Sequence, residues 1–414
     1  MMKKYKLSMI TKIMIAVILG LGFGLLFGDL SKSLKVFGDI FLRLIQMSIP
    51  LLVFGQIIEA VARLDPKEVS GLGIKTIIIF ASSSILAAFW GITVALIFKP
   101  GSGVNIVGLN TGVEVAAQNI SIKDTLLGFF PSNIISSLAS GSIIQIIVFS
   151  LVFGVAFSMY RTTHKDSIML PLLTEFNEVI IKLITLIMSF APIGIFLLIA
   201  ALIGQVGISV IIPLVKYLGI FGLATISYLS AWIILISTKC KLSPVRLVKN
   251  MTAMLVMALA TTSSAITLPI EMEDSEKKLG LGDRITKLVL PLGMSLNSNG
   301  SAMHMAITVI TIAQIYNINY GMDKIIYIGI IAALVSLANA VVPGAGLVSL
   351  AIIVPQMGLP IESIALFAGV EWFVGMLRTI LNVAADVFTA ILVANDENEI
   401  NHDVFDGIDS LNQQ

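Results

Sequence analysis

The sequence predicts an all-α membrane protein with eight transmembrane helices and two re-entrant helical hairpins, arranged as inverted repeats. Of its 414 residues, 57% are hydrophobic and 12% are charged, whereas about a quarter of the residues in soluble domains carry charge. Long apolar runs follow one another along the whole chain. Two of the later runs are interrupted by polar and helix-breaking residues, and each is followed by an apolar segment with polar residues at its centre.

The composition also excludes several classes of function. The formal net charge is +1, which gives no basic footprint of the kind that nucleic-acid binding requires. Cys240 is the only cysteine, so no internal disulfide can form, and three histidines are too few for a histidine-rich metal centre. Nucleic-acid partners, zinc and thiol redox chemistry are therefore not expected.

Six ordinary spans account for the first part of the chain. The N-terminal run follows four lysines, as in a signal peptide, but no small-residue cleavage site comes after it, and it is predicted to be a retained first helix. Charged residues, glycine or proline separate the runs. The six spans lie at 8–28, 36–61, 71–98, 124–159, 168–203 and 208–237.

The remaining apolar sequence is less regular. The stretch 250–270 is broken by Thr261 to Ser264 and by Pro269, and the stretch 325–355 by polar residues and Pro343. Lipid cannot satisfy freed backbone groups, so such segments must face protein or a watery cavity. One broken segment could be a kinked ordinary span, but two in corresponding places favour re-entrant hairpins. The apolar segments 284–314 and 360–394 complete the eight spans.

The basic residues predict the orientation in the membrane. With an inside N-terminus and re-entrant hairpins, 17 of the 26 Lys and Arg residues fall inside, five fall outside, and the other four lie within spans. This asymmetry follows the positive-inside rule and would be lost if either hairpin crossed the membrane. Both termini are therefore expected in the cytoplasm, and the acidic tail of residues 395–414 is expected to be solvated and partly disordered.

A polar stretch inside an apolar segment predicts a cation site. Residues 291–301 hold seven polar or glycine positions, which are costly in lipid unless they bind something. Gly293 and Gly300 allow the helix to unwind and free carbonyl oxygens, and Asn297 and its neighbours add side-chain oxygens of the kind that hard cations prefer. The alternative is hydrogen bonding between helices, which contributes only about 1 kcal/mol per contact.

The last span carries a polar face suited to an acidic ligand. Arg378, Thr379, Asn382 and Asp386 recur at helical spacing. An intramembrane arginine can bind a carboxylate through two hydrogen bonds, and Asp386 offers a negative ligand for a cation. The alternative is a structural ion pair of Arg378 with Asp386 or with Glu371. The hairpin tips at 262–264 and 342–346 expose backbone N–H groups that can hold an anion.

These residues resemble the dicarboxylate/amino acid:cation symporter family, which includes glutamate transporters. The resemblance covers nearly the whole chain. It rests on Phe130-Pro-Ser-Asn133, Ala191-Pro-Ile-Gly194, Thr267-Leu-Pro269, Asn297-Ser-Asn-Gly-Ser301, Val342-Pro-Gly-Ala-Gly346 and Arg378-Thr-x-x-Asn382-x-x-x-Asp386. It implies a homotrimer in the lipid bilayer of the cell membrane, in which a transport domain slides like an elevator. The scaffold would comprise 1–70 and 124–203, and the transport domain 71–99 and 208–394.

The resemblance also implies the ligands of substrate and sodium. Substrate would lie near Ser263, Ser264, Ser301, Val342, Gly346, Gly375, Arg378, Thr379 and Asn382. One sodium ion would bind among Gly293, Asn297, Asn382 and Asp386. A second would be held by the carbonyls of Ser295, Ser336, Leu337 and Asn339.

Four positions depart from the family pattern. The signature aspartate is Asn299, and a tyrosine that supports the same cation is Phe80, although Ser83 and Ser84 remain; a third sodium site is therefore weakened. The aspartate that receives the substrate's amino group in amino-acid carriers is Gly375, which weakens recognition of an amine. The signature methionine is Ser298, whose effect the sequence does not define.

Two further residues are candidates for carrying a proton. His304 follows the signature by three residues and titrates near neutral pH in water; a packed neutral ring is the alternative. Glu371 lies about two turns before Arg378 and is either a second proton site or the resting partner of that arginine.

The predicted function is secondary active symport, not enzymatic catalysis. The substrate is expected to be a small acid, a C4-dicarboxylate or an acidic amino acid, imported with sodium and with protons as a second candidate ion. Gly375 favours an acid without an amine. Alternatives are a carrier of neutral amino acids or an ion channel. No HExxH or GxSxG motif supports an intramembrane enzyme.

Overall fold

The computed structural model describes residues 9–63, 69–102, 127–164, 166–207, 211–337 and 345–408. Over these ranges the only β-structure is an isolated bridge between Leu281 and Ile400, so the predicted all-α class is confirmed there. The long helices before residue 207 are α1 (Met9–Phe27), α3 (Lys35–Ala62), α5 (Ile74–Phe98), α8 (Ile143–Thr163), α9 (Met169–Ser189) and α10 (Ala191–Val206).

The longer helices from Ile211 onward are α11 (Ile211–Lys239), α12 (Pro244–Thr261), α13 (Ser264–Lys277), α14 (Asp283–Leu296), α15 (Asn299–Ile315), α16 (Met322–Ser336), α17 (Ala345–Gln356) and α19 (Glu371–Glu397). Short elements are α2 (Asp29–Lys32), η1 (Val69–Gly73), α7 (Ile134–Ser140), η3 (Ile361–Ser363), α18 (Ile364–Ala368) and α20 (His402–Phe405).

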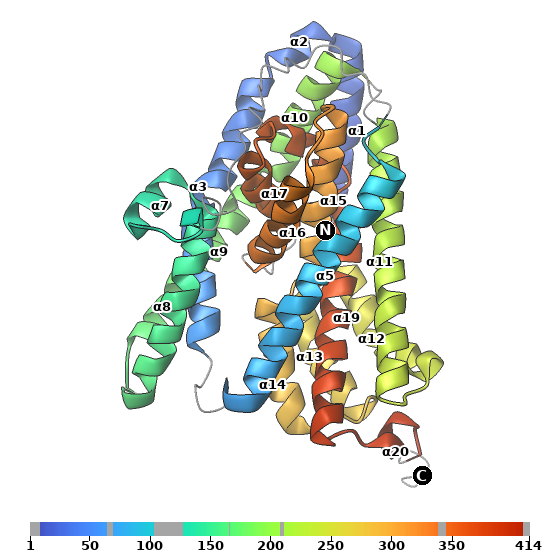
Figure 1. Ribbon diagram of the computed structural model, residues 1–414. Helices are drawn as coiled ribbons and strands as arrows, with labels where there is room; N and C mark the ends of the chain where they lie inside the picture. Colours follow the sequence, from blue (N-terminus) through green and yellow to red (C-terminus); the bar gives the residue numbers. More distant parts are fainter. Residues whose placement is uncertain are drawn as a thin grey trace, which may run out of the picture.

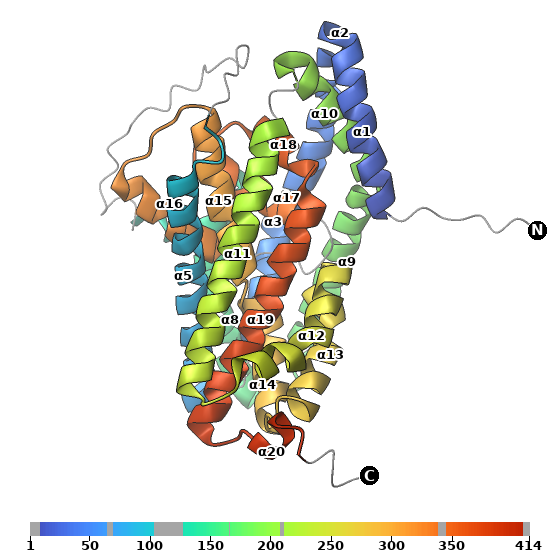
Figure 2. The same ribbon diagram turned by 90° about the vertical axis from the view of Figure 1, so that its right-hand side faces the viewer.

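The helices pack in two groups. Helix α1 packs along α10, and α3 packs against α8, α9 and α10. In the other group, α15 and α19 lie at the centre, where α15 contacts α5 and α16, and α19 contacts α11, α12 and α14. Figure 2 shows α19 running between α11 on one side and α12 and α13 on the other, while in Figure 1 α8 and α9 lie beside α3. Most side chains of the two central helices therefore meet protein, whereas Phe373 near the start of α19 is exposed.

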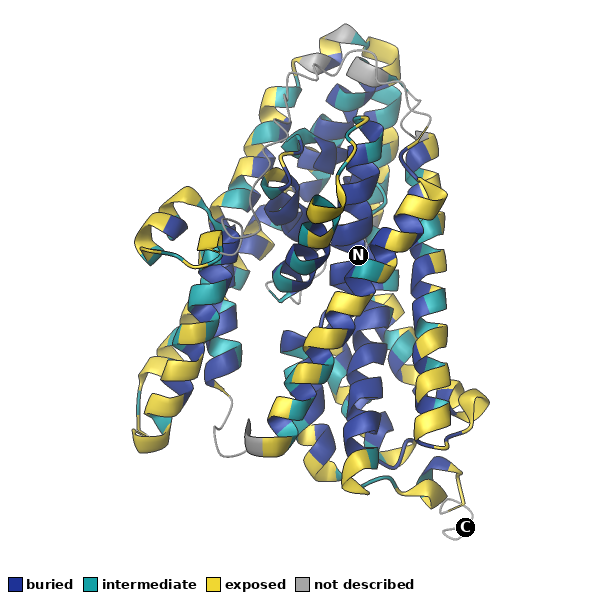
Figure 3. Cartoon of the chain, in the orientation of Figure 1, coloured by how far each residue is buried: buried dark blue, intermediate teal, exposed yellow. Residues whose placement is uncertain are grey.

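Burial follows the same division. Nearly every residue of α15 and of α19 from Arg378 to Ala394 is buried. The outer helices α3, α8 and α11 alternate buried and exposed positions (Figure 3), and their exposed positions are largely apolar. Exposed apolar side chains on this scale are typical of a surface that contacts lipid. Polar groups that lie on α15 and α19 are thus kept away from that surface.

Two helical hairpins approach the centre from opposite ends of the molecule. Helices α12 and α13 pack against each other and rise from the end where α20 lies, whereas α16 and α17 descend from the other end (Figure 1). At 1.5 Å per residue, the 14 residues of α13 and the 12 of α17 are too short for a hydrocarbon core of about 30 Å. The hairpin arms agree with the predicted re-entrant segments, although residues 338–344 lie outside the described ranges.

Five described helices are long and apolar enough to cross a membrane, namely α3, α5, α8, α11 and α19. Helices α9 and α10 form a sixth candidate only as a pair bent by 52°. The apolar part of α1 is shorter, and α14 and α15 are separate helices broken at Asn297 and Ser298. The number of eight spans therefore stays a prediction.

Two of the predicted spans have different bounds in the structure. The run predicted as one span at 124–159 contains α7 and α8, because Gly141 adopts φ +68° and ends α7, a conformation that glycine tolerates. The run at 168–203 is two helices that meet at Phe190, because Pro192 lies in the first turn of α10 and has no N–H to continue α9. Neither predicted span is therefore one continuous helix, although α9 and α10 together have the length and hydropathy of a single span.

Most positions of the acidic tail up to Ile408 are exposed to solvent, but the tail is also docked on the neighbouring helices. Phe405 is 2% exposed, and the backbones of Asn401 and Gly280 are hydrogen-bonded at 2.8 Å. Basic side chains from four elements pair with tail carboxylates: Lys75 and Lys239 with Asp396, Arg246 with Asp406, and Arg284 with Glu397 and Glu399. Exposed pairs of this kind contribute at most about 1 kcal/mol each, so the buried phenylalanine is the main anchor.

Candidate functional site

The break between α14 and α15 exposes backbone and side-chain oxygens at the centre of the molecule. Asn297 and Ser298 leave the helical conformation, with φ and ψ of −111° and 105° at Asn297. Two glycines make room for α19: a Cβ on Gly293 would collide with the Asp386 carboxylate, and one on Gly300 would collide with the Arg378 carbonyl. The glycines predicted to permit unwinding therefore also allow α19 to approach the break.

Asp386 lies at this break. Its Oδ1 accepts a hydrogen bond of 2.7 Å from Asn297 Nδ2, while its Oδ2 has no partner among the described residues. One turn earlier, Asn382 Oδ1 accepts a 2.7 Å hydrogen bond from the Gly300 N–H. The structure thus brings together Gly293, Asn297, Asn382 and Asp386, the four residues predicted for the first cation.

Asn299 stands beside α5. Its Oδ1 accepts hydrogen bonds from Ser83 Oγ at 3.1 Å and Ser84 Oγ at 2.8 Å, and its Nδ2 has no partner among the described residues. Phe80 is buried one turn below. The amide oxygen is therefore already committed to two hydroxyl donors, which leaves it less able to serve a cation than the carboxylate that the family pattern has there.

Glu271 is a buried acid that the sequence analysis missed. Its side chain, on α13, is fully buried, neither carboxylate oxygen has a hydrogen-bond partner among the described residues, and it interacts electrostatically with Asp386. A signal existed in the sequence: Thr267, Glu271, Asp274 and Ser275 recur at helical spacing and are all buried. The surrounding charges, such as exposed Glu273, make the segment resemble a solvated face.

Arg378 lies higher on α19 and is paired with an internal carboxylate. Its Nη1 donates to Glu371 Oε1 at 3.0 Å, and both side chains are less than 10% exposed. This is the structural ion pair that the sequence left open as an alternative. The backbone of Gly346 hydrogen-bonds Glu371, and a Cβ on Gly346 would collide with both Arg378 and Glu371. The second hairpin therefore closes directly over the arginine.

The tip of the first hairpin reaches the same arginine. Thr262 has φ +51° and ends α12, and Ser263 caps α13 by accepting from the Ile266 N–H. A Cβ on Gly375 would lie 3.7 Å from the Thr262 side chain and 3.8 Å from Arg378 Nη2. Thr262 Oγ1 is buried without a hydrogen-bond partner among the described residues. Both hairpin tips thus lie near Arg378, and Thr262 was among the predicted tip residues.

His304 is buried beside Glu371. Its Nε2 lies 4.0 Å from Glu371 Oε2, and its Nδ1 lies 2.7 Å from the Tyr217 hydroxyl. The Tyr217 hydroxyl is also 2.8 Å from Thr308 Oγ1. The two predicted proton candidates are therefore neighbours, and Tyr217 on α11 is a partner that the sequence did not indicate.

The structure describes fewer contacts for the remaining predicted residues, and two of them lie outside the described ranges. Ser264, Ser301 and Thr379 are buried near the tips and the arginine, and Thr379 Oγ1 donates to the Gly375 carbonyl. Val342 and Asn339 lie outside the described residues. Ser295 closes α14 and Ser336 and Leu337 end α16, but no hydrogen bond among the described residues joins these two sets. The second sodium site stays a prediction.

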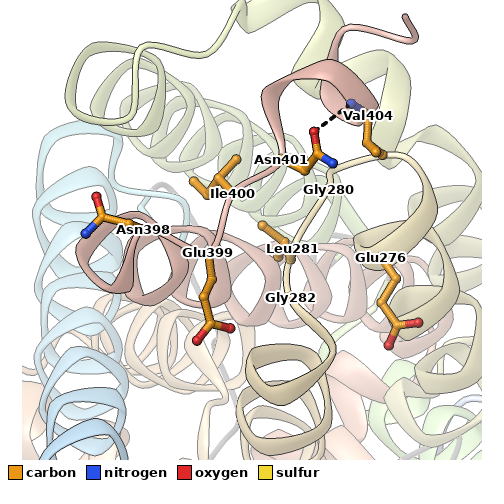
Figure 4. A pocket seen from close by; sticks show the side chains of 9 residues that line it. All are labelled: Glu276, Gly280, Leu281, Gly282, Asn398, Glu399, Ile400, Asn401 and Val404. Carbon is orange, nitrogen blue, oxygen red and sulfur yellow. Dashed lines mark hydrogen bonds between the residues drawn. The ribbon is translucent and has the colours of Figure 1, made fainter. Parts of the chain in front are cut away.

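A separate surface pocket of about 420 Å³ lies between the α13–α14 loop and the tail. Figure 4 shows Gly280, Leu281 and Gly282 facing Ile400 and Asn401, whose side chain accepts from the Val404 N–H. Its walls are the α13–α14 loop and the tail, which contact each other there. It holds none of the predicted substrate or cation residues.

Comparisons with known proteins identify the family of this chain. The profile of the sodium:dicarboxylate symporter family matches residues 9–396. The proton/glutamate-aspartate symporter of Escherichia coli is 32% identical, covering 96% of this chain and 95% of the relative. The proton/sodium-glutamate symport protein of Bacillus caldotenax is 31% identical, covering 96% of both. The C4-dicarboxylate transport protein of Rhodospirillum rubrum is 30% identical, covering 97% of this chain and 91% of the relative.

These matches confirm the resemblance read from the sequence motifs, and they span nearly the whole length of both partners. Relatives of this kind are symporters, so the expectation of transport rather than catalysis is also confirmed. The chain is a membrane transporter that belongs to the sodium:dicarboxylate symporter family.

Proposed function

We propose that this protein imports a small acidic substrate, a C4-dicarboxylate or an acidic amino acid, together with sodium. The observation that carries the proposal is the convergence of both hairpin tips on a buried arginine: Gly346 from one side and Thr262 from the other. A buried guanidinium needs an anion, and a carboxylate satisfies its fork with two hydrogen bonds. Two short hairpins that end there can open to either side of the membrane in turn.

The substrate class follows from what surrounds Arg378. The substrate's first carboxylate replaces Glu371 on the guanidinium, and tip N–H groups and Asn382 hold the second. Gly375 offers no anion for an amino group, although it lies next to Arg378 and Thr262, so a dicarboxylate is favoured. The relatives' names include both glutamate-aspartate symporters and C4-dicarboxylate transport proteins.

Sodium is proposed to bind at the break between α14 and α15. Asp386 Oδ2 and both oxygens of Glu271 are buried without hydrogen-bond donors among the described residues, and uncompensated carboxylates at that depth are costly. A sodium ion among Asp386, Asn297, the carbonyls near Gly293 and Asn382, and the Glu271 carboxylate would offset that cost. Carboxylate, amide and carbonyl oxygens are the ligands that such hard cations take. Ser295, Ser336, Leu337 and Asn339 are proposed for a second ion.

The transport cycle is proposed to be an elevator movement within a homotrimer in the cell membrane, with both termini in the cytoplasm. The packing supports this division, because α5 and α11 to α19 surround one buried centre while α1, α3 and α8 to α10 pack among themselves. The transport domain would comprise 71–99 and 208–394, moving against a scaffold of 1–70 and 124–203.

Uptake into proteoliposomes tests the proposal. Succinate, L-aspartate, L-glutamate and L-alanine are offered with sodium, lithium or choline outside. We expect saturable uptake of an acidic substrate that stops when the sodium gradient is collapsed. Uptake of alanine alone would overturn the substrate class. Non-saturable flux that ignores the gradient would indicate a channel instead.

A further inference from the structure

The second buried carboxylate oxygen of Glu371 faces an imidazole. Glu371 Oε1 is taken by Arg378 at 3.0 Å, while Oε2 lies 4.0 Å from His304 Nε2. Neither Oε2 nor Nε2 has a hydrogen-bond partner among the described residues. Both side chains are at most 8% exposed, and an unsatisfied polar pair at such depth is costly. A proton on either atom would make one of them a donor and the other an acceptor, and a hydrogen bond would form once they approach to about 3 Å.

The other side of the imidazole is already organised. His304 Nδ1 is 2.7 Å from the Tyr217 hydroxyl, which also lies 2.8 Å from Thr308 Oγ1. Because Thr308 donates to the His304 carbonyl at 2.8 Å, its oxygen can still accept from Tyr217. Tyr217 can therefore accept from Nδ1–H or donate to bare Nδ1, and the ring can present Nε2 to Glu371 with or without a proton.

The surroundings isolate this pair from other charges. Phe221 lies across the ring of His304 with centroids 5.9 Å apart, and Phe367 covers Tyr217 at 4.9 Å. The titratable or charged side chains that face the pair are Tyr217 from α11 and Arg378 from α19. From α5, α16 and α17, no described titratable side chain makes an ion pair or hydrogen bond with either residue. Among the described residues, the fixed charges at this pair are therefore those of Arg378 and Glu371.

Charge counting links a proton at this pair to the substrate. Arg378, Glu371 and a neutral His304 sum to zero, so adding a substrate carboxylate would leave one uncompensated buried negative charge, which is strongly unfavourable. Adding one proton to the pair first raises the sum to +1. The substrate carboxylate then returns it to zero. The count is the same whether the proton lies on Glu371 or on His304, because the two act as one coupled site.

We infer that Glu371 and His304 form a proton-binding site whose occupation releases Arg378 to bind the substrate's carboxylate. This inference rests on the proposed function, because it assumes that the substrate pairs with Arg378. Without the proton, Glu371 holds the guanidinium and competes with the substrate. With it, Glu371 ceases to be a full counter-ion, and Arg378 turns to the substrate beneath the Gly346 and Thr262 tips. Proton and acidic substrate therefore bind together and are released together.

Isothermal titration calorimetry of the purified protein tests this inference. Succinate and L-aspartate are titrated at saturating sodium, between pH 6 and 8, in buffers of different ionisation enthalpy. We expect the wild type to take up about one proton per substrate, with affinity falling up to about tenfold per pH unit as the pH rises. Glu371→Gln, which keeps the shape but not the charge, should bind without proton uptake, independently of pH, and more tightly than the wild type at pH 8.

Three further variants locate the proton and guard against a folding defect. His304→Gln keeps a polar group beside Glu371 but cannot take a proton, so the pH at which affinity falls should move. Glu273→Gln and His164→Gln change an exposed acid and an exposed histidine, and both should behave as the wild type. Substrate binding by the wild type without proton uptake would overturn this inference and leave the proposed function standing. Failure to bind any acidic substrate would overturn both.

Discussion

The two halves of α19 present opposite electrostatic situations. In the first half, Arg378 is buried but neutralised by Glu371. In the second half, Asp386 is buried near Glu271, with no described basic side chain in ion-pair contact with either acid. The first half already contains its own substitute for an anionic ligand. The second half contains only anions and must obtain its cation from solution.

Under the proposed function, this difference would let one helix couple two ligands. An acidic substrate would enter the first half by displacing Glu371, whereas sodium would enter the second half without displacing a charged group. Gly300 connects them, since its N–H holds Asn382 while its Cα packs on the Arg378 carbonyl. A cation that fixes the Asp386 side chain would therefore also restrain the position of Arg378, which lies about two helical turns away on α19.

The largest effects should come from removing the charge that defines each half. Arg378→Ala should lose binding of succinate and L-aspartate by more than about a hundredfold, because the substrate carboxylate would then be buried unpaired. Thermal stabilisation by sodium should persist in this variant. Arg246→Ala, which removes an exposed partner of Asp406, is the matched control and should bind normally. Equal loss of sodium stabilisation in Arg378→Ala would break the separation of the two halves.

Asp386→Asn should abolish sodium-dependent uptake, because it removes the carboxylate that faces the freed carbonyls while keeping its shape. Sodium should then no longer raise the melting temperature. Asp283→Asn, at an exposed position on α14, controls for the loss of one acid. A variant that still required sodium would place the ion elsewhere.

Gly375→Asp sharpens the description of the first half. The space beside Gly375 admits a Cβ in ordinary contact with Thr262 and Arg378, so the added carboxylate can face the substrate. Selectivity should shift towards L-aspartate over succinate, by up to about a hundredfold, because a hydrogen-bonded charge partner contributes a few kcal/mol. Competition binding of the two acids measures the shift. A wild type that already preferred L-aspartate strongly would contradict the argument from Gly375.

Glu271→Gln tests whether the second half uses two acids. Sodium affinity, measured by the sodium dependence of thermal stability, should fall by about tenfold, since an amide offsets cation dehydration less well than a carboxylate. Glu273→Gln lies two residues away on the exposed face and should have no effect. Unchanged sodium affinity in Glu271→Gln would leave Asp386 as the sole acidic ligand.

The smallest effect concerns stoichiometry. Asn299 is neutral and Phe80 lacks a hydroxyl, so fewer than three sodium ions should accompany each substrate. Reversal potentials in proteoliposomes measure the ratio. A slope that corresponds to three sodium ions would show that Ser83, Ser84 and the Asn299 amide suffice for a third site.

The sequence predicted what depends on local pattern. Interrupted apolar stretches indicated the hairpins: α12 ends at the polar run, where Thr262 has φ +51° and Ser263 caps α13, although Pro269 lies inside α13 without ending it. Helical spacing placed Arg378, Asn382 and Asp386 on one face, and all three are buried towards the centre. Family motifs then supplied roles that spacing alone could not.

What the sequence missed depends on tertiary contacts. Glu271 is flanked by exposed charges, and only the fold shows that its face packs under Asp386. The tail was expected to be solvated and partly disordered, yet Phe405 is buried and its carbonyl accepts a hydrogen bond from Asn250 on α12. The bend at Phe190 was hidden by uninterrupted hydropathy, in which Pro192 alone marked a break.

We expect an acidic substrate at Arg378 and sodium at Asp386 to bind interdependently. This expectation is tested most directly by measuring succinate and L-aspartate affinity while sodium is varied, and sodium affinity while the acid is varied. Each ligand should raise the protein's affinity for the other by the same factor, as linkage requires. Equal affinity for the acid in sodium and in choline would contradict it.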